Sequence, residues 1–244
     1  MILQRTFASR DTAGRQAGAD ENRLGTDPVS PAWVGELDAA KDAHTMLIAA
    51  AFRPDGTDAW ISFHEKKSGG AWHMAMSTPG YIGEHGLYKT REGDRKTPVG
   101  VFRFNRAFGI ADDPGCAIPY LKVDEDMYWS SDSREGYHYN RLISRRDFPG
   151  LDLQNAVMEH LIGCTRQYQY CLNISYNEEC IPGLGSAIFL HCFGPEKPFT
   201  AGCIAIPEDR MKFVMQRVTE DTVVVIDTCE KLSGGAELPD IPRL

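Results

Sequence analysis

Residues 186–206 read SAIFLHCFGPEKPFTAGCIAI, and this stretch indicates both the fold and the chemistry to expect. It begins with a short apolar strand, residues 186–191, which ends in His191. A second short strand, residues 203–206, starts at Cys203. The eleven residues between them contain two prolines and two glycines, which favour a stiff loop rich in turns. If the two strands are neighbours in a sheet, the imidazole and the thiol meet at one end of that sheet.

A cysteine with a histidine close to it indicates nucleophilic catalysis. The thiolate is the reactive species, and an adjacent imidazole favours its formation. Gly202, directly before Cys203, permits a tight turn that points backbone N–H groups at a developing oxyanion. A histidine at the end of an apolar strand is also common as a structural residue that hydrogen-bonds locally. A metal site with Cys192 is the weaker alternative, because the stretch lacks the paired spacing of structural zinc ligands.

The rest of the chain predicts a fold rich in β-strands. Short apolar or alternating runs are separated by turns that contain glycine or proline, and the first three runs are typical of an antiparallel meander. The predicted strands are residues 45–52, 59–64, 72–77, 97–104, 169–176 and 222–228. Helical spacing predicts one helix over residues 151–167 and another that begins at Pro207. Residues 105–150 show little regular pattern, as expected of a functional lid or of an ordinary surface excursion.

Composition excludes several classes of protein. The chain has 244 residues, with 26 Lys+Arg against 34 Asp+Glu and a formal net charge of −8. This charge argues against a nucleic-acid partner, which requires a basic stripe. No apolar run approaches the roughly 18 residues that predict a membrane span. The seven cysteines are an odd number, so at least one thiol stays outside any intramolecular disulfide framework.

The two ends differ in composition from the centre. Residues 1–42 are rich in Ala, Gly, Asp and Arg without a clear period, which predicts a loosely ordered N-terminal extension. Residues 43–230 form the predicted catalytic domain, and residues 231–244 form a tail rich in Gly and Pro. No apolar core follows a basic start, so no secretory signal peptide is visible.

Five runs of the sequence are similar to motifs of one known protein family. The runs FLH at residues 189–191 and TAGCI at residues 200–204 are similar to the family signature, a strand-end histidine followed by Ser/Thr-x-Gly-Cys. GDRKTPVGVF at residues 93–102 is similar to a second family feature. Tyr139-Asn140 and YQYCLNISYN at residues 168–177 also resemble this branch. Together these runs resemble the L,D-transpeptidase (YkuD-type) catalytic domain family, and the resemblance covers about residues 45–228.

The resemblance implies a mainly β fold: a β-sandwich-like sheet core with packed helices and a lid-like insertion. It implies acyl transfer at peptidoglycan stem peptides, with Cys203 as nucleophile and His191 as general base and acid. Gly202 and the Cys203 N–H would form the oxyanion hole. The expected substrate-binding residues are Thr200, Ala201, Tyr139 and Asn140. No metal or organic cofactor is implied, and the expected location is outside the cytoplasm, in the periplasm or cell wall.

Three positions depart from the family pattern. Ala201 stands where many members have a second histidine, and Cys192 follows the strand-end histidine where glycine is common. Ala205 stands where many members have Arg or Asn to meet a substrate carboxylate. The arginines that could supply this charge instead are Arg141, Arg145, Arg146 and Arg210. Cys203 is the thiol expected to stay unpaired, and the other six cysteines are inert thiols or form up to three bridges.

Three interpretations of the function stay open. The leading interpretation is L,D-transpeptidation through a Cys203 thioacyl-enzyme. An L,D-carboxypeptidase or an interbacterial wall-degrading effector is the first alternative, and the missing signal peptide favours the effector. A non-catalytic wall-binding protein on the same scaffold is the second alternative. The sequence does not indicate the oligomeric state.

Overall fold

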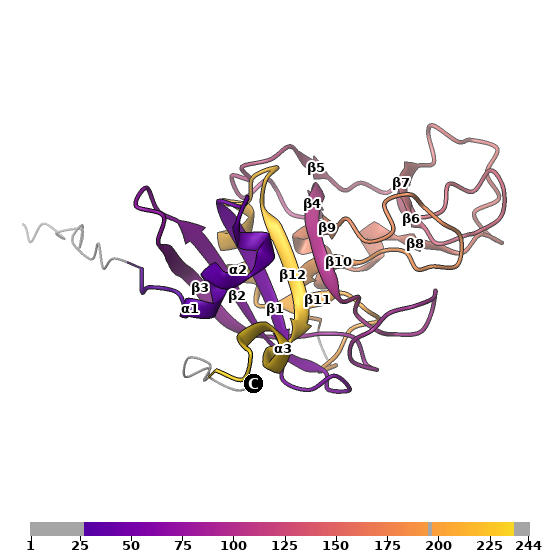
Figure 1. Ribbon diagram of the computed structural model, residues 1–244. Coiled ribbons are helices and arrows are strands. Elements are labelled where there is room, and N and C mark those ends of the chain that lie inside the picture. Colours follow the sequence, from indigo (N-terminus) through magenta and orange to yellow (C-terminus); the bar gives the residue numbers. More distant parts are fainter. Residues whose placement is uncertain (1–26, 195–196, 237–244) are drawn as a thin grey trace, which may run out of the picture.

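The computed structural model describes residues 27–194 and 197–236, and this part of the chain is mainly β (Figure 1). The strands of the larger sheet are β1 (Thr45–Ala51), β2 (Asp58–Lys66), β3 (Trp72–Tyr81), β4 (Gly100–Gly109), β5 (Tyr120–Lys122), β9 (Cys171–Ile174), β10 (Phe189–Cys192), β11 (Ile204–Ile206) and β12 (Val223–Thr228). Those of the smaller sheet are β6 (Met127–Ser130), β7 (Arg141–Ser144) and β8 (Met158–His160). The helices are α1 (Ala32–Glu36), α2 (Glu208–Met215) and α3 (Cys229–Ser233), with 3₁₀ turns η1 (Asp38–Ala40), η2 (Leu161–Gly163) and η3 (Gln167–Gln169).

The larger sheet closes on itself. Its strand order is β12-β1-β2-β3-β11-β10-β9-β4-β5, and β4 also pairs with β12. The ring therefore runs through eight strands, with β5 added beside β4. Closure gives the strands partners on both sides, which removes exposed sheet edges. The predicted antiparallel meander is confirmed as β1, β2 and β3.

The ring has an apolar layer on each face, and β1 shows why. Leu47, Ala49 and Ala51 point into the core cluster inside the ring. Met46, Ile48 and Ala50 point outward into a second cluster. A strand buried on both faces reads as a continuous apolar run, which explains the sequence MLIAAA.

Helices cover both apolar layers. α2 begins after Pro207, as its sequence predicts, and four side chains from this region enter the inner cluster: Met211, Val214, Met215 and Val218. On the outer face, Trp33 of α1 packs edge-on against Trp60 of β2, with 6.0 Å between ring centroids. Figure 1 shows α1 and α3 near β1 and β12 on this outer side.

Part of the predicted loose extension is ordered. Trp33 and Val34 are buried, so residues 27–42 belong to the packed domain. A helix of five residues is too short to display a period, and the outer face of the sheet supplies its burial. Residues 1–26 lie outside the described residues. At the other end α3 continues to Ser233, and residues 237–244 of the predicted tail lie outside the described residues.

The predicted helix over residues 151–167 is wrong. The carboxylate of Asp152 accepts hydrogen bonds from the backbone N–H groups of Gln154 and Asn155, which compete with a helical turn. Further along, the N–H of Val157 donates to Asp132 Oδ2 at 3.0 Å, and β8 then pairs with β6. These long-range partners outweigh the local helical spacing, so the segment becomes a strand followed by two 3₁₀ turns.

Residues 105–150 contain more regular structure than their sequence predicts. They supply the end of β4 together with β5, β6 and β7, and Figure 1 shows the smaller sheet to one side of the ring. Aromatic packing joins the two sheets: Trp129 of β6 lies 4.8 Å from Phe189 of β10, measured between ring centroids. The smaller sheet is therefore attached directly behind the strand that carries His191.

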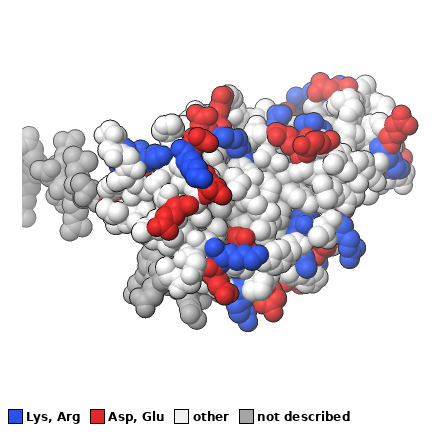
Figure 2. Space-filling model, in the orientation of Figure 1, with Lys and Arg blue, Asp and Glu red and all other residues white. Residues whose placement is uncertain are grey.

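The surface carries charges of both signs. Figure 2 shows acidic and basic side chains interspersed on the visible face. Among the described residues, no helix has the length and apolar character required to cross a bilayer. All seven cysteines are free thiols in the structure, so the six cysteines other than Cys203 form no bridge with one another.

Candidate active site

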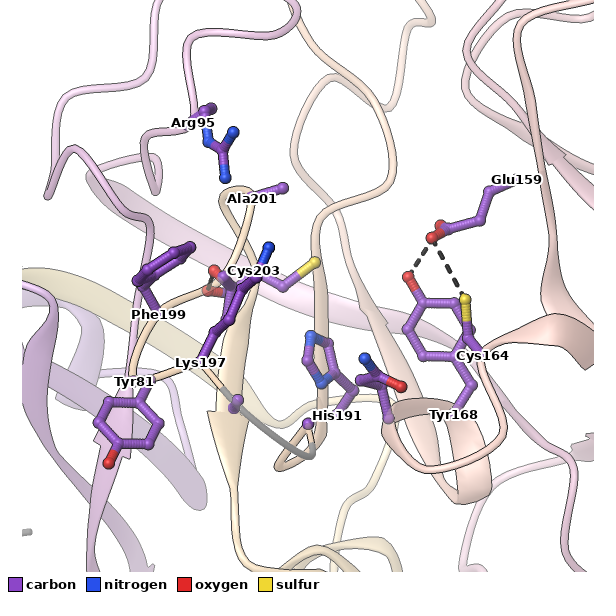
Figure 3. A pocket seen from close by; sticks show the side chains of 14 residues that line it. Tyr81, Arg95, Glu159, Cys164, Tyr168, His191, Lys197, Phe199, Ala201 and Cys203 are labelled. Atoms are coloured by element: carbon purple, nitrogen blue, oxygen red, sulfur yellow. Dashed lines mark hydrogen bonds between the residues drawn. The ribbon is translucent and has the colours of Figure 1, made fainter.

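His191 and Cys203 open into one cavity. The strands β10 and β11 are parallel neighbours, with Leu190 opposite Ile204 and His191 opposite Ala205. Cys203 directly precedes β11, so its side chain lies near the end of the strand that carries the histidine. Both residues line a cavity of about 340 Å³ (Figure 3). The expectation that these two strands are neighbours is confirmed.

The Cys203 thiol is buried and hydrogen-bonded to the backbone. Its Sγ donates to the carbonyl of Ala187 at 3.2 Å and accepts from the N–H of Phe189 at 3.3 Å. Burial raises the pKa of Cys203 to about 12, because the thiolate would lose its hydration. The resting Cys203 side chain is therefore a neutral thiol at physiological pH.

His191 has a defined tautomer. Its Nδ1 lies 2.7 Å from the carbonyl oxygen of Cys192. Since a carbonyl only accepts, Nδ1 carries the hydrogen and Nε2 keeps a lone pair. Burial lowers the pKa of His191 to about 4, so the ring is neutral at physiological pH. The group that orients the histidine is thus a backbone carbonyl, and Nε2 is available to accept a proton.

Cys192 turns away from this pair. Its Sγ donates to the carbonyl of Tyr170 at 3.8 Å, and its side chain belongs to the core inside the ring. Successive side chains of a strand point to opposite faces, so Cys192 and His191 are on different sides of β10. Among the described residues no cluster of His, Cys, Asp and Glu could hold a metal ion.

Two threonines hold the turn before Cys203. Thr200 Oγ1 accepts from the N–H of Gly202 at 3.0 Å and donates to the carbonyl of Cys203 at 2.6 Å. Thr97 Oγ1 donates to the carbonyl of Gly202 at 2.8 Å and accepts from the N–H of Gly83 at 2.9 Å. The Gly202 N–H, one of the two expected oxyanion donors, is therefore bound to Thr200 in the resting structure.

Gly202 itself has a backbone conformation that L side chains rarely adopt. Its φ is +139°, and a Cβ at this position would lie 2.8 Å from the carbonyl oxygen of Lys96. Real Cβ atoms do not approach backbone that closely. The glycine is thus required by the turn that presents Cys203.

The cations beside the cavity are not the four arginines that the sequence offered. Arg95 and Lys197 line the cavity, each with its charge 5.8 Å from the Phe199 ring, and Arg95 also pairs with Glu84. Arg141 lines a separate pocket, Arg145 and Arg146 pair with Asp126, and Arg210 pairs with Asp209. The position of Arg95 inside the GDRKTPVGVF stretch was the signal that could have singled it out.

The opposite wall comes from the smaller sheet and the turns after it. Glu159 of β8 accepts from Tyr168 Oη at 2.8 Å and from Cys164 Sγ at 3.5 Å, and all three residues line the cavity. The Tyr168 ring also packs edge-on against His191, with 5.6 Å between centroids. The sequence did not indicate Glu159 and Cys164, because it predicted a helix over them, and it offered Tyr168 only as the first residue of the YQYCLNISYN stretch.

The other expected substrate-binding residues divide into two groups. Thr200 and Ala201 line the cavity. Tyr139 and Asn140 are buried and do not line it. Tyr139 Oη donates to Glu92 at 2.6 Å, and Asn140 Oδ1 accepts from the N–H of Ala187 at 3.1 Å. The hydrogen bond between Asn140 and Ala187 holds Ala187 in place, and the Ala187 carbonyl accepts the hydrogen of the Cys203 thiol.

Comparison with known families identifies the domain. A model of the L,D-transpeptidase catalytic domain family, YkuD, matches residues 59–226. The chain belongs to this family. The match includes His191 and Cys203, and it confirms the resemblance and the mainly β fold expected from it.

The solved structures to which this chain is similar have low sequence identity with it. They include the helical cell shape determining protein Pgp2 from Campylobacter jejuni, at 15% identity and a TM-score of 0.41, with 77% of this chain and 49% of that chain covered. A cysteine-to-serine mutant of the Enterococcus faecium L,D-transpeptidase has 14% identity and a TM-score of 0.35, covering 77% and 50%. This chain spans about half the length of these proteins. No curated protein matches the sequence.

Proposed function

We propose that this protein is a cysteine acyltransferase that acts on peptidoglycan stem peptides, with Cys203 as nucleophile and His191 as general base and acid. The observation that carries the proposal is the cavity that both the Cys203 thiol and a histidine of defined tautomer line. Membership of the L,D-transpeptidase catalytic domain family supports the choice of substrate.

The resting thiol donates its hydrogen to the Ala187 carbonyl, so proton transfer to His191 accompanies the attack. The resting pair is neutral, because burial raises the pKa of Cys203 to about 12 and lowers that of His191 to about 4. As Cys203 Sγ attacks the peptide carbonyl after an L-centre, its proton passes to His191 Nε2. The tetrahedral intermediate collapses to a thioester, and His191 protonates the leaving amine of the terminal D-residue.

Binding of the stem peptide uses the cations beside the cavity. The terminal D-residue carries a carboxylate, and Arg95 and Lys197 line the cavity that would receive it. These two side chains take the place of the Arg or Asn that many family members carry where this chain has Ala205. The Cys203 N–H is proposed as the oxyanion donor, since the Gly202 N–H is already bound to Thr200.

The test measures acylation and products on purified tetrapeptide muropeptides. We expect wild-type protein to form a covalent adduct on Cys203 that intact-mass spectrometry detects, and Cys203→Ala to form none. Cys180→Ala is the matched control, because Cys180 is a half-buried thiol outside the cavity. Full turnover by Cys203→Ala contradicts the proposal.

The products separate transfer from hydrolysis. Cross-linked dimers are expected from a transpeptidase, whereas tripeptides with free D-alanine identify an L,D-carboxypeptidase or a wall-degrading effector. Binding of muropeptides without any adduct on Cys203 identifies a non-catalytic wall-binding protein.

A further inference from the structure

The cavity has a second charged wall that the proposed acylation step does not use. Figure 3 shows Arg95 and Phe199 on one side of Cys203, and Glu159, Tyr168 and Cys164 on the other. Glu159 is the one carboxylate among the described residues that line the cavity. It lies on β8 opposite Trp129 of β6, so the smaller sheet holds it firmly against the site.

The carboxylate of Glu159 is only partly satisfied. Oε2 accepts from Tyr168 Oη at 2.8 Å and Oε1 accepts from Cys164 Sγ at 3.5 Å. Both donors are neutral, and none of the ion pairs between described residues includes Glu159. A carboxylate offers about four lone-pair sites. About two acceptor sites therefore have no donor among the described side chains, and Glu159 lines the cavity.

The surroundings of Glu159 favour binding of a cationic group. Burial raises the pKa of Glu159, because the charged carboxylate is poorly hydrated in this wall. A cation placed beside it would offset that cost with a charge-assisted hydrogen bond. The opposite wall already carries positive charge, so the cavity as a whole is bipolar: it matches an anion at the Arg95 end and a cation at the Glu159 end.

We propose that Glu159 binds the ammonium group of the acyl acceptor and takes a proton from it, and so selects amines over water. This inference rests on the proposed formation of a Cys203 thioester. The acceptor class is a primary amine that is charged at neutral pH. Glu159 then acts after acylation, in the step that decides between transfer and hydrolysis.

The step balances in protons and electrons. The ammonium gives one proton to the Glu159 carboxylate, and the freed nitrogen lone pair forms the C–N bond at the thioester carbonyl. A second proton passes from this nitrogen to His191 Nε2. The C–S bond breaks with its electron pair on Sγ, and His191 returns its proton there. The products are an amide, the Cys203 thiol and a carboxylic acid at Glu159, which releases its proton to water.

The experiment compares Glu159→Gln with wild type on the same tetrapeptide muropeptide. Glutamine preserves the hydrogen bond from Tyr168 but removes the charge. We expect the ratio of dimer to tripeptide formed from the acylated protein to fall about 10- to 100-fold, as for loss of a hydrogen bond to a charged group. Glu125→Gln is the matched control, because Glu125 is an exposed carboxylate just before β6 and outside the cavity.

A second nucleophile separates charge recognition from a structural effect. Hydroxylamine is uncharged at neutral pH, so its transfer rate should be the same for Glu159→Gln and wild type. An equal loss with hydroxylamine and with the amine overturns the inference, as does an unchanged ratio of dimer to tripeptide. Absence of any Cys203 adduct in wild type overturns the proposed function and this inference together, whereas a normal adduct with an unchanged ratio overturns the Glu159 assignment alone.

Discussion

The hydroxyl of Thr97 donates a 2.8 Å hydrogen bond to the carbonyl of Gly202, which lies 105 positions later in the chain. The same hydroxyl accepts from the N–H of Gly83 at 2.9 Å. One buried side chain thus ties the turn that presents Cys203 to the segment after β3. This contact gives a structural reason for the threonine in GDRKTPVGVF.

Thr97→Val should therefore weaken both the fold and the site. Valine has nearly the same shape but leaves the two backbone groups without a partner, which costs about 1–3 kcal/mol each when the groups stay buried. We expect a lower free energy of unfolding in urea and slower acylation of Cys203. Thr97→Ser keeps the hydroxyl and is the control. Equal behaviour of the valine and serine variants would show that the hydrogen bonds are unimportant.

Gly202→Ala should misplace the Cys203 side chain. The φ of +139° is strained for alanine, and the new Cβ would meet the carbonyl oxygen of Lys96 at 2.8 Å. Strain of this kind costs on the order of 1–3 kcal/mol, and the turn must shift to relieve it. We expect a lower melting temperature and loss of Cys203 acylation. Gly69→Ala is the control, since a Cβ there meets nothing within 4 Å; an active Gly202→Ala enzyme argues against the turn as a requirement.

The pH dependence of acylation should follow His191. The ring accepts a proton only when it is neutral, and its pKa is lowered to about 4 by burial. The acylation rate should be constant across neutral pH and fall as the pH drops through about 4, because the ring then becomes protonated. Cys203 stays protonated well into the alkaline range, with its pKa at about 12. An acid limb near the ordinary histidine value of about 6.5 would refute this description.

Asn140 should act as a positioning residue. Its Oδ1 accepts from Trp129 Nε1 and from the N–H of Ala187, both at 3.1 Å, and the Ala187 carbonyl receives the Cys203 thiol hydrogen. We expect Asn140→Ala to lower kcat with little change in KM, and to lower stability by about 1–3 kcal/mol. A rise in KM alone would instead support the substrate contact that the sequence predicts. Asn155→Ala is the control, because Asn155 is exposed.

The accuracy of the sequence-based predictions depends on the range of the interactions involved. The strands around β1 and the helix after Pro207 were predictable, because alternation, apolar runs and N-terminal proline act over a few neighbouring residues. The structure of residues 151–167 was not predictable, because Asp132 and β6 supply its hydrogen-bond partners from more than twenty positions away. The buried α1 escaped detection for a related reason: the surface that buries Trp33 is assembled from distant strands.

The sequence by itself determined the family, the strand that carries His191, the strand that follows Cys203, and a glycine turn before the cysteine. These features are local, since each motif depends on residue types within a short stretch. Only the tertiary structure decided that Arg95, rather than the arginines near residues 141–146, lies beside the cavity, and that Glu159 faces it from the other side. Those positions follow from closure of the eight-stranded ring and from docking of the smaller sheet on β10. Both result from hydrophobic burial between distant segments, which no local pattern records.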